Sequence, residues 1–589
     1  MVVQTSAGRI RGKTMRVLSG KVTAYLGIPY AEPPIGQLRF AKPVPSKPWT
    51  NVREVTKYSN TCYQNVSNSE SKALWEKIWS PNTELSENCL YLNLWVPSPR
   101  PKKAAVMVWI HGGAFMSGSS SLLVYNGRFL SHTQKVIVVS MNYRLGVFGF
   151  LALPGNSDVP GNMGLFDQRL ALQWVHDNIA AFGGNPKSVT LFGQSAGAAS
   201  INMHLIASQS SSLFHRVIMQ SGSSNTPWAF VKSVDAKHRA AAFGKRIGCP
   251  YSSDAEFLSC LRGKSAYDVL CYSLADPQSN LLSQVIFLPV ATGDFFTEKA
   301  EMLMQQKIVE KKQILQGTNR DEATYFLAMG GPGFSKDTES VIGRKDFVKA
   351  VKWILPENTV LTVDDIECEY IDEKDEDSTI NYRDAVASMA ADSLFVCPMK
   401  QFANKYAGQG NKVYSYLFNH LPPAGAWQKW MGVMHGYEIV FVFGMPFNKF
   451  GKWTQAEEVL SKNMMNYWST FARTGNPIGQ EVTTVKWPVY TQLKQQYIIL
   501  NAKRLEVKKS FESKRVTSGI KRFPNSSRAE INETEEQWKE EFSQWYSHIL
   551  GWKDQFNAFK NKKYGCAGEA MNPVGKIVQC IHKNDMTPA

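Results

Sequence analysis

The chain has 589 residues, of which 43% are hydrophobic and 20% charged, a composition that predicts a large globular protein with a core of its own. Its formal charge of +16 at pH 7 is of a size that can indicate nucleic-acid or anionic-membrane partners. No nucleic-acid-binding motif accompanies that charge and no run of about 18 apolar residues is free of polar interruption, so we expect no nucleic-acid partner, no transmembrane helix and a solvated basic surface.

Short apolar runs that read as strands alternate with helical patterns along most of the chain. Near the start, residues 8–12 and 22–26 predict an antiparallel edge. Later strands are expected at residues 104–110, 136–141, 188–192, 216–220, 313–316 and 413–418. Between them, residues 165–182 place Phe166, Leu170, Trp174 and Val175 on one helical face. The alternation predicts an α/β fold with a mostly parallel sheet covered on both faces, in one catalytic domain over residues 1–527.

The C-terminal segment has a different character. Aromatic and aliphatic residues recur there in heptads, at Trp538, Trp545, Trp552 and Phe559, with Phe542, Ile549 and Phe556 at the alternate position. This pattern predicts an amphipathic helix over residues 528–566 that associates with other copies of the chain; the alternative is a helix packed on its own catalytic domain. Cys566 is a candidate for an interchain disulfide, and residues 567–589 are expected to be disordered.

Nine cysteines occur, and none falls in a zinc-binding pattern, so we expect no metal and no cofactor. The spacings of Cys62 with Cys89 and of Cys249 with Cys260 suit loop-closing disulfides. Three glycosylation sequons, at Asn65, Asn525 and Asn532, also suit an extracellular protein. No signal peptide is visible after Met1, so we expect a secreted protein, or one held at the cell surface through its tail, whose signal peptide is absent from this sequence.

The strongest local motif is FGQSAG at residues 192–197, which follows an expected strand and precedes a helix-favouring run. That is the context of a nucleophile elbow, in which a strained turn exposes the serine, here Ser195. An earlier strand ends in WIHGGAF at residues 109–115, the kind of loop with which esterases aim backbone N–H groups at an oxyanion.

A serine nucleophile needs a base and an acid, which in this fold follow it in the order serine, acid, histidine. His435 lies in a loop-like stretch beyond a strand and is the candidate base. Asp321 and Glu322 both close an earlier strand and turn, and spacing alone does not choose between them.

These motifs, together with GNMGLFDQ at residues 161–168, AAFGGNP at 180–186 and GVMHGYE at 432–438, resemble the type-B carboxylesterase/cholinesterase family over roughly residues 5–510. Within it the chain is most similar to vertebrate cholinesterases, acetyl- and butyryl-, and residues 530–566 are similar to their tetramerisation tail. The resemblance implies the α/β-hydrolase fold and a serine esterase that forms homo-oligomers (dimers or tetramers) through the tail, with a proline-rich anchoring partner.

The resemblance also implies a role for individual residues. It makes Glu322 the acid of a triad with Ser195 and His435. It implies an oxyanion hole at Gly113, Ala114 and Ala196, a choline site at Trp79, Tyr125, Tyr325 and Glu438, and an acyl pocket at Trp228, Ser283 and Val285. Serine and valine are small for that pocket, so a butyryl group or a larger one is expected to fit.

At several positions the chain departs from the cholinesterase pattern. Gln194 stands where cholinesterases have glutamate, His111 where they have tyrosine and Ala114 where they have glycine. Ser67 and Leu274 replace residues of the peripheral site.

Three functions are open on the sequence alone. A choline-ester hydrolase with a butyryl-type pocket is favoured by Trp79 and the tail. A broad carboxylesterase for neutral or xenobiotic esters is favoured by Gln194, His111 and Ala114. A non-catalytic adhesion protein with this fold is disfavoured, because a complete set of catalytic residues is present.

Overall fold

The computed structural model describes residues 1–66, 78–276, 279–291, 295–296, 311–355, 359, 361–371, 379–422, 427–448, 451–478 and 485–509. The predicted tail helix at 528–566, with Cys566, lies outside the described residues, as do Asn525, Asn532 and Ser67. No helix in the described ranges is both long and apolar enough to cross a membrane.

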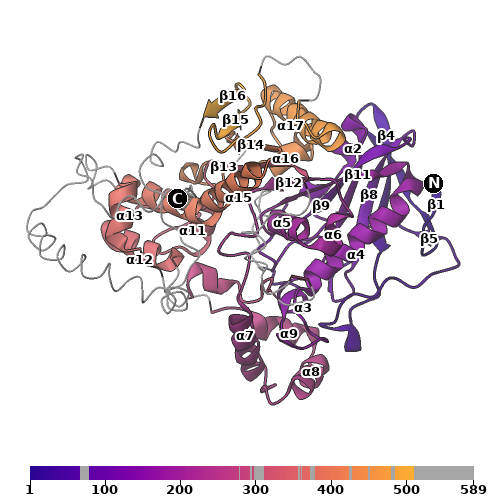
Figure 1. The fold of residues 1–589 in the computed structure, drawn as a ribbon, viewed down its shortest axis with the longest axis horizontal. Helices are drawn as coiled ribbons and strands as arrows, with labels where there is room; N and C mark the ends of the chain where they lie inside the picture. Colours follow the sequence, from indigo (N-terminus) through magenta and orange to yellow (C-terminus); the bar gives the residue numbers. More distant parts are fainter. Residues whose placement is uncertain are drawn as a thin grey trace, which may run out of the picture.

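An 11-stranded sheet forms the centre of the described part (Figure 1), in the order β16-β15-β14-β13-β12-β11-β9-β10-β8-β4-β3. The seven strands from β15 to β10 are parallel neighbours, and β16, β8, β4 and β3 are antiparallel additions at the two ends. The strands are β3 (Lys13–Val17), β4 (Gly20–Pro29), β8 (Tyr91–Ser98), β9 (Ala104–Ile110), β10 (Ile137–Met141), β11 (Gly184–Gln194), β12 (Arg216–Gln220), β13 (Gln313–Asn319), β14 (Val413–Phe418), β15 (Gln496–Leu500) and β16 (Glu506–Lys509). The α/β fold expected from the sequence is therefore confirmed.

Alternate residues of the buried strands face two separate cores. In β9, Val106 and Val108 belong to one core, whereas Met107 and Trp109 belong to the other. Because side chains of a strand alternate between the two faces of a sheet, this division shows that both faces are covered. The larger helices are α2 (Arg128–Gln134), α4 (Met163–Asn178), α5 (Ala196–Ile206), α7 (Ser233–Arg246), α8 (Asp254–Gly263), α9 (Ala266–Ser273), α11 (Thr324–Gly330), α12 (Arg344–Ile354), α13 (Val363–Tyr370), α14 (Thr379–Ala391), α15 (Cys397–Gly408) and α17 (Gln455–Thr474).

The predicted helix at residues 165–182 forms as α4 followed by a 3-10 turn, Ile179–Phe182. Its buried face is wider than the apolar stripe, because Asp167 is fully buried as well. The two guanidinium nitrogens of Arg144 donate to the Asp167 carboxylate at 2.8 and 2.7 Å, so the buried charge is paired. Polar residues of this kind cannot be assigned to a core from hydrophobic periodicity.

A small second sheet lies beside the antiparallel end of the large one, at the N-terminal side of the molecule (Figure 1). It contains β1 (Val2–Gln4), β2 (Arg9–Arg11) and β5 (Arg53–Glu54). Only Gly12 separates β2, the middle strand of the small sheet, from β3, the last strand of the large one, so one stretch of chain joins the two sheets. The antiparallel edge predicted for residues 8–12 and 22–26 is present.

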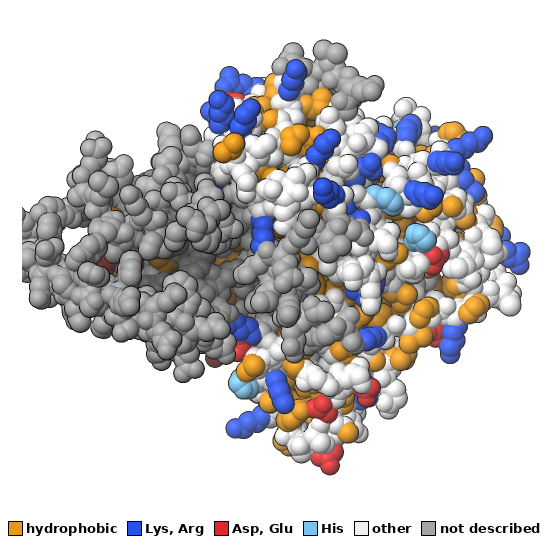
Figure 2. Space-filling view, in the orientation of Figure 1, with side chains coloured by type: hydrophobic (Ala, Val, Ile, Leu, Met, Phe, Trp, Pro, Cys, Tyr) orange, Lys and Arg blue, Asp and Glu red, His pale blue; other side chains and the backbone are white. Residues whose placement is uncertain are grey.

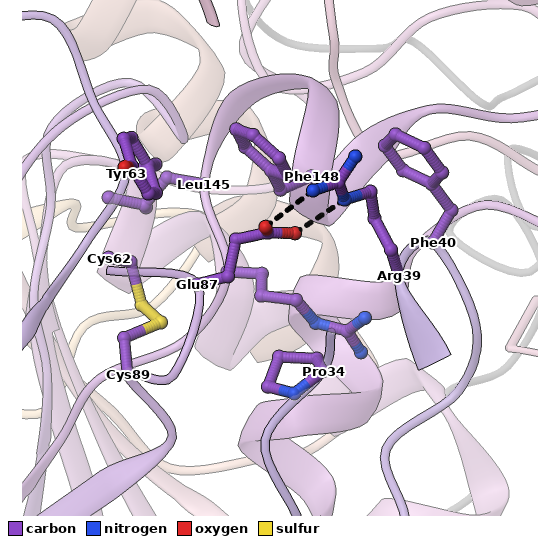
Figure 3. A pocket seen from close by; sticks show the side chains of 10 residues that line it. Pro34, Arg39, Phe40, Cys62, Tyr63, Glu87, Cys89, Leu145 and Phe148 are labelled. Atoms are coloured by element: carbon purple, nitrogen blue, oxygen red, sulfur yellow. Dashed lines mark hydrogen bonds and ion pairs between the residues drawn. A yellow bond between two sulfur atoms is a disulfide. The ribbon is translucent and has the colours of Figure 1, made fainter. Parts of the chain in front are cut away.

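Two disulfides, Cys62–Cys89 and Cys249–Cys260, have the pairing expected from the sequence. A small cavity borders the first of them (Figure 3), where Arg39 makes a two-pronged ion pair with Glu87 at 2.6 and 2.7 Å. Arg39 also donates to the carbonyl oxygen of Lys264 at 2.7 Å, so it ties the disulfide-closed loop to the end of α8.

The other cysteines have different environments. Cys368 is disulfide-bonded, Cys271 is an exposed thiol and Cys397 is a buried one. Cys580 lies outside the described residues.

Candidate active site

Ser195 lies between β11 and α5, in the strand–turn–helix context expected for a nucleophile. Its backbone has φ 57° and ψ −125°, a strained conformation for a residue with a side chain. The Ser195 N–H donates to the carbonyl of Gln220 in β12 at 2.8 Å. At Gly197 a Cβ would stand 2.0 Å from the carbonyl oxygen of Ile110, so only glycine lets the turn approach the end of β9. The glycine brings the expected nucleophile and the Gly-rich loop together.

Glu322 and His435 are in direct contact. The two residues are separated by 113 positions in the chain, yet His435 Nδ1 lies 2.6 Å from Glu322 Oε2. The other oxygen of this fully buried carboxylate accepts the Asn319 N–H at 2.7 Å. The carboxylate thus holds the imidazole with Nε2 on its far side.

Asp321, the other acid that the sequence left open, faces elsewhere. Its Oδ2 accepts the backbone N–H of Val433 at 2.6 Å and lies 2.8 Å from the guanidinium of Arg320. The two neighbouring carboxylates therefore have separate surroundings, and Glu322 is the one that contacts the imidazole.

The second nitrogen of His435, Nε2, is buried and has no hydrogen-bond partner among the described residues. Ser195 itself is 6% exposed. A Cβ on Gly436, the residue after His435, would lie 3.7 Å from Gln194 Nε2, which places the imidazole loop next to the residue that precedes Ser195.

Two phenylalanines that sequence reasoning missed enclose the imidazole. The ring centroids of Phe395 and Phe326 lie 4.7 and 5.2 Å from that of His435. Phe395 belongs to a π-helical turn, Asp392–Val396, between α14 and α15. No motif surrounds either residue, so only the three-dimensional structure reveals them.

The three backbone groups expected to form an oxyanion hole belong to Gly113, Ala114 and Ala196. Within the described ranges, no acceptor binds their N–H groups, and the N–H of Ala196 is at the first position of α5, where no intrahelical partner exists. Ala114 has φ 52°, the left-handed conformation usual for the glycine it replaces.

His111, which precedes this loop, is buried and stacks on Tyr143 with ring centroids 4.5 Å apart. Burial lowers the pKa of His111 to about 4, so the ring is neutral at pH 7. It packs behind the oxyanion loop as an uncharged aromatic group.

Trp79 and Tyr125, two residues of the expected choline site, lie side by side with ring centroids 6.1 Å apart. Trp79 is held in a loop whose two sides are joined by the Cys62–Cys89 disulfide and by the Thr61 N–H, which donates to Glu84 O at 2.8 Å. Tyr325 lies nearer the surface, half-buried, with its ring 6.2 Å from that of Trp427.

Gln194 borders the same region. A Cβ on Gly436 would lie 3.6 Å from the Trp79 ring and 3.7 Å from Gln194 Nε2, so the three residues surround one point. Gln194 is 5% exposed, and its Nε2 has no hydrogen-bond partner in the part of the chain that the structure describes. A buried amide donor without a partner is costly, and it can be satisfied by a bound molecule.

Glu438, two residues after Gly436, is completely buried, and both its oxygens accept hydrogen bonds, from Gln220 at 2.9 Å and from Asn319 at 2.7 Å. Burial, followed by the nearby charge of Glu322, raises the pKa of Glu438 above its ordinary value. Any effect of Glu438 on a substrate is therefore exerted through its charge and through Asn319, which also donates its backbone N–H to Glu322.

The expected acyl-pocket residues are not all brought together. Trp228 is buried, donates its Nε1 to the Leu394 carbonyl at 2.9 Å and lies 5.7 Å from Phe395 between ring centroids. Val285 is buried in the same core. Ser283, in contrast, is exposed on the turn Leu281–Gln284, and Leu274 is exposed as well.

The chain is similar to known proteins over nearly its whole length. The carboxylesterase family matches residues 1–518, and the acetylcholinesterase tetramerisation domain matches residues 532–566. A cholinesterase of Mus musculus is 45% identical over 567 residues, which cover 96% of this chain and 94% of that protein. An acetylcholinesterase of Bungarus fasciatus is 46% identical over 567 residues, covering 96% and 93%. An acetylcholinesterase of Danio rerio is 43% identical over 601 residues, covering 96% and 95%.

Proposed function

Since this chain belongs to the carboxylesterase family and is a carboxylic ester hydrolase, we propose that it hydrolyses choline esters, with a pocket that accepts a butyryl group, through Ser195, His435 and Glu322. Two observations support the catalytic part of the proposal: the contact of His435 Nδ1 with Glu322 Oε2 at 2.6 Å, and the strained turn at Ser195. The Trp79–Tyr125 pair carries the choline part.

The proposed reaction has two halves. Ser195 Oγ attacks the ester carbonyl carbon while His435 Nε2 accepts the hydroxyl proton, and Glu322 stabilises the imidazolium that forms. The N–H groups of Gly113, Ala114 and Ala196 stabilise the tetrahedral oxyanion. The protonated imidazole then gives its proton to the departing alcohol, and a water deprotonated by His435 hydrolyses the acyl-enzyme.

A quaternary ammonium carries no N–H to donate, so a site for it must rely on charge and on aromatic faces. Trp79 and Tyr125 offer such faces, and the charge of Glu438 lies behind them. Trp228, Phe395 and Val285 are proposed to enclose the acyl chain, with Phe395 in the place where the sequence suggested Ser283.

A second candidate function, hydrolysis of neutral esters, is favoured by one observation. Gln194 presents an unpaired amide donor beside Trp79, where a carboxylate would attract a cation. An uncharged leaving group with an acceptor oxygen would satisfy that donor, whereas a choline group would not.

The test is kcat/KM for butyrylthiocholine against an uncharged thioester of the same acyl length and leaving-group size, in the wild type and in Trp79→Ala. A cation preference of about tenfold, or 1.4 kcal/mol, that disappears in Trp79→Ala supports the choline ester. Equal kcat/KM values for the two substrates would contradict the choline-ester proposal and support hydrolysis of neutral esters. Covalent labelling of Ser195 by an organophosphate separates both from a non-catalytic adhesion protein.

The match at residues 532–566 supports oligomerisation through the tail. We further propose that four tails can surround a proline-rich partner and that the protein is extracellular, which the two disulfides favour. Light scattering of the full chain, with and without a polyproline peptide, tests the assembly.

A further inference from the structure

The positive charge of this protein is concentrated in its first part. Residues 1–157 contain 18 Lys and Arg residues and six Asp and Glu residues, which gives +12 of the chain's total of +16. No acidic residue occurs between Glu87 and Asp158. In Figure 2, Lys and Arg side chains gather over the region of α2, β4 and β1, with little red among them.

Five of these cations lie on one continuous stretch of chain that ends at the edge of the large sheet, and we name this stretch the basic edge: Arg9, Arg11, Lys13, Arg16 and Lys21. All five are exposed. They belong to β2, to β3, which is the last strand of the large sheet, and to the start of β4, its hairpin partner.

The strand geometry places Arg9, Arg11 and Lys13 in an extended row, and Arg16 and Lys21 as a pair on the opposite face of the hairpin. Ile10 is buried and Gly12 faces the Tyr25 ring, so Arg9, Arg11 and Lys13 alternate outward at intervals of about 6.6 Å. Farther along, Arg16 and Lys21 are paired directly across the hairpin. Like charges at opposed positions of two strands destabilise the pairing, so this hairpin has an unrelieved repulsion.

Carboxylates relieve little of that charge. Arg11 has an ion pair with Glu54 at 2.8 Å, and both side chains are about half exposed, which makes the pair weak. Across the described ranges, no carboxylate forms an ion pair with Arg9, Lys13, Arg16 or Lys21. At the hairpin turn His132 packs at Gly20, and burial, followed by the charge of Lys135, lowers the pKa of His132, so this ring neither adds to the positive charge at pH 7 nor relieves it.

Protection of an edge strand does not account for this arrangement. Charged residues at a sheet edge do prevent strands of other molecules from adding to it. Charges of either sign serve that purpose, however, and a mixture would avoid the Arg16–Lys21 repulsion. The single sign over five positions favours a negatively charged ligand.

We propose that the basic edge binds a linear sulfated polysaccharide. A row of three cations followed by the Arg16–Lys21 pair matches a chain with repeated negative charges better than it matches a single anion. The two disulfides indicate an oxidising compartment, where sulfated polysaccharides rather than nucleic acids are the abundant linear polyanions. The basic edge has none of the residues of the active site, so the polysaccharide binds without contacting the substrate.

The experiment measures binding of the full chain to immobilised heparin over a range of salt concentrations. The test variant is Arg9→Gln, Lys13→Gln, Arg16→Gln and Lys21→Gln together. The matched control removes the same charge from exposed lysines elsewhere, as Lys187→Gln, Lys245→Gln, Lys345→Gln and Lys352→Gln. Butyrylthiocholine turnover, expected to be unchanged in both, verifies that each variant is folded.

Loss of the basic edge should weaken heparin binding at least about tenfold and lower the slope of log Kd against log salt concentration by roughly three to four, about one for each cation removed. The control variant should bind almost as the wild type does. Equal losses in both variants would show a general charge effect and overturn the proposal. Duplex DNA or phosphatidylserine vesicles that bind as tightly as heparin, with the same loss in the test variant, would overturn the assignment to a sulfated polysaccharide.

Discussion

The proposed catalytic centre (Ser195, Glu322 and His435) and the proposed alcohol pocket (Trp79, Tyr125 and Gln194) differ in how completely their polar groups are hydrogen-bonded. In the catalytic centre, both oxygens of Glu322 have donors and the imidazole of His435 is held on one side and enclosed by Phe326 and Phe395. In the alcohol pocket, the amide of Gln194 is buried beside Trp79 without a partner for its Nε2.

This difference suggests that one set of residues performs the reaction and the other set selects the substrate. Groups that act on the ester carbonyl must be held in place before the substrate arrives, because the reaction needs a fixed geometry. Groups that recognise the alcohol can be left to pair with the substrate. We therefore expect changes in the catalytic centre to affect all esters alike and changes in the alcohol pocket to affect only the ratio between esters.

The largest effect is expected for Ser195→Ala. Removal of the nucleophile should lower kcat by about 10⁴-fold or more for every ester, since only the oxyanion hole and binding remain. Steady-state turnover of butyrylthiocholine and of its neutral analogue measures it. Near-normal turnover of either substrate would show that the catalytic centre is not built around Ser195.

Glu322→Gln should have the next largest effect. The amide keeps the shape of the side chain but loses the charge that stabilises the imidazolium, so kcat should fall by about 10³–10⁴-fold for both substrates. Asp321→Asn is the matched control, because the neighbouring carboxylate contacts Val433 and Arg320 instead. The assignment of the acid would be reversed if the Asp321 variant lost more activity than the Glu322 variant.

The sequence predicted the turn at Ser195 and the loop at Gly113 better than it predicted the surroundings of the proposed pockets. The elbow at Ser195 and the loop at Gly113 follow strands whose apolar runs are visible, so local pattern was enough to place them. The sequence could not choose between Glu322 and Asp321, because they occupy consecutive positions. Only the folded structure distinguishes them, through the contact of Glu322 with His435, 113 residues farther along the chain.

The walls of the pockets come from segments with no local signal. Phe395 lies in a π-helical turn that hydrophobic periodicity does not indicate, and Ser283 lies on a turn that the structure leaves exposed. Likewise, the opposition of Arg16 and Lys21 depends on the pairing of β3 with β4, which the order of charges in the sequence does not indicate by itself.

Val285→Phe should produce an intermediate effect that is confined to the acyl group. Val285 is buried in the core that contains Trp228, so a larger ring there should fill the acyl pocket and lower the ratio of butyryl to acetyl turnover by about tenfold or more, equivalent to the 1–3 kcal/mol cost of overpacking. Ser283→Phe is the matched variant on the exposed turn and should change that ratio by less than about twofold. A larger change of that ratio in Ser283→Phe than in Val285→Phe would show that Ser283, and not Val285, lines the acyl pocket.

The smallest effect, and the one that most directly tests the alcohol pocket, is expected for Gln194→Glu. A carboxylate beside Trp79 would attract a bound cation by roughly 1 kcal/mol at an effective dielectric near that of a solvated site. The preference of kcat/KM for butyrylthiocholine over the neutral thioester should therefore rise about fivefold.

Gln194→Met provides the control, because it removes the amide donor and adds no charge. In that variant the cation preference should rise only slightly, and turnover of a neutral ester with an acceptor oxygen in its alcohol should fall. The gain in Gln194→Glu should also diminish at low pH, because burial raises the pKa of a carboxyl group and the protonated form has no charge to offer. If Gln194→Glu and Gln194→Met gave the same cation preference at neutral pH, charge at this position would have no part in selectivity, and the pocket would recognise its alcohol by shape alone.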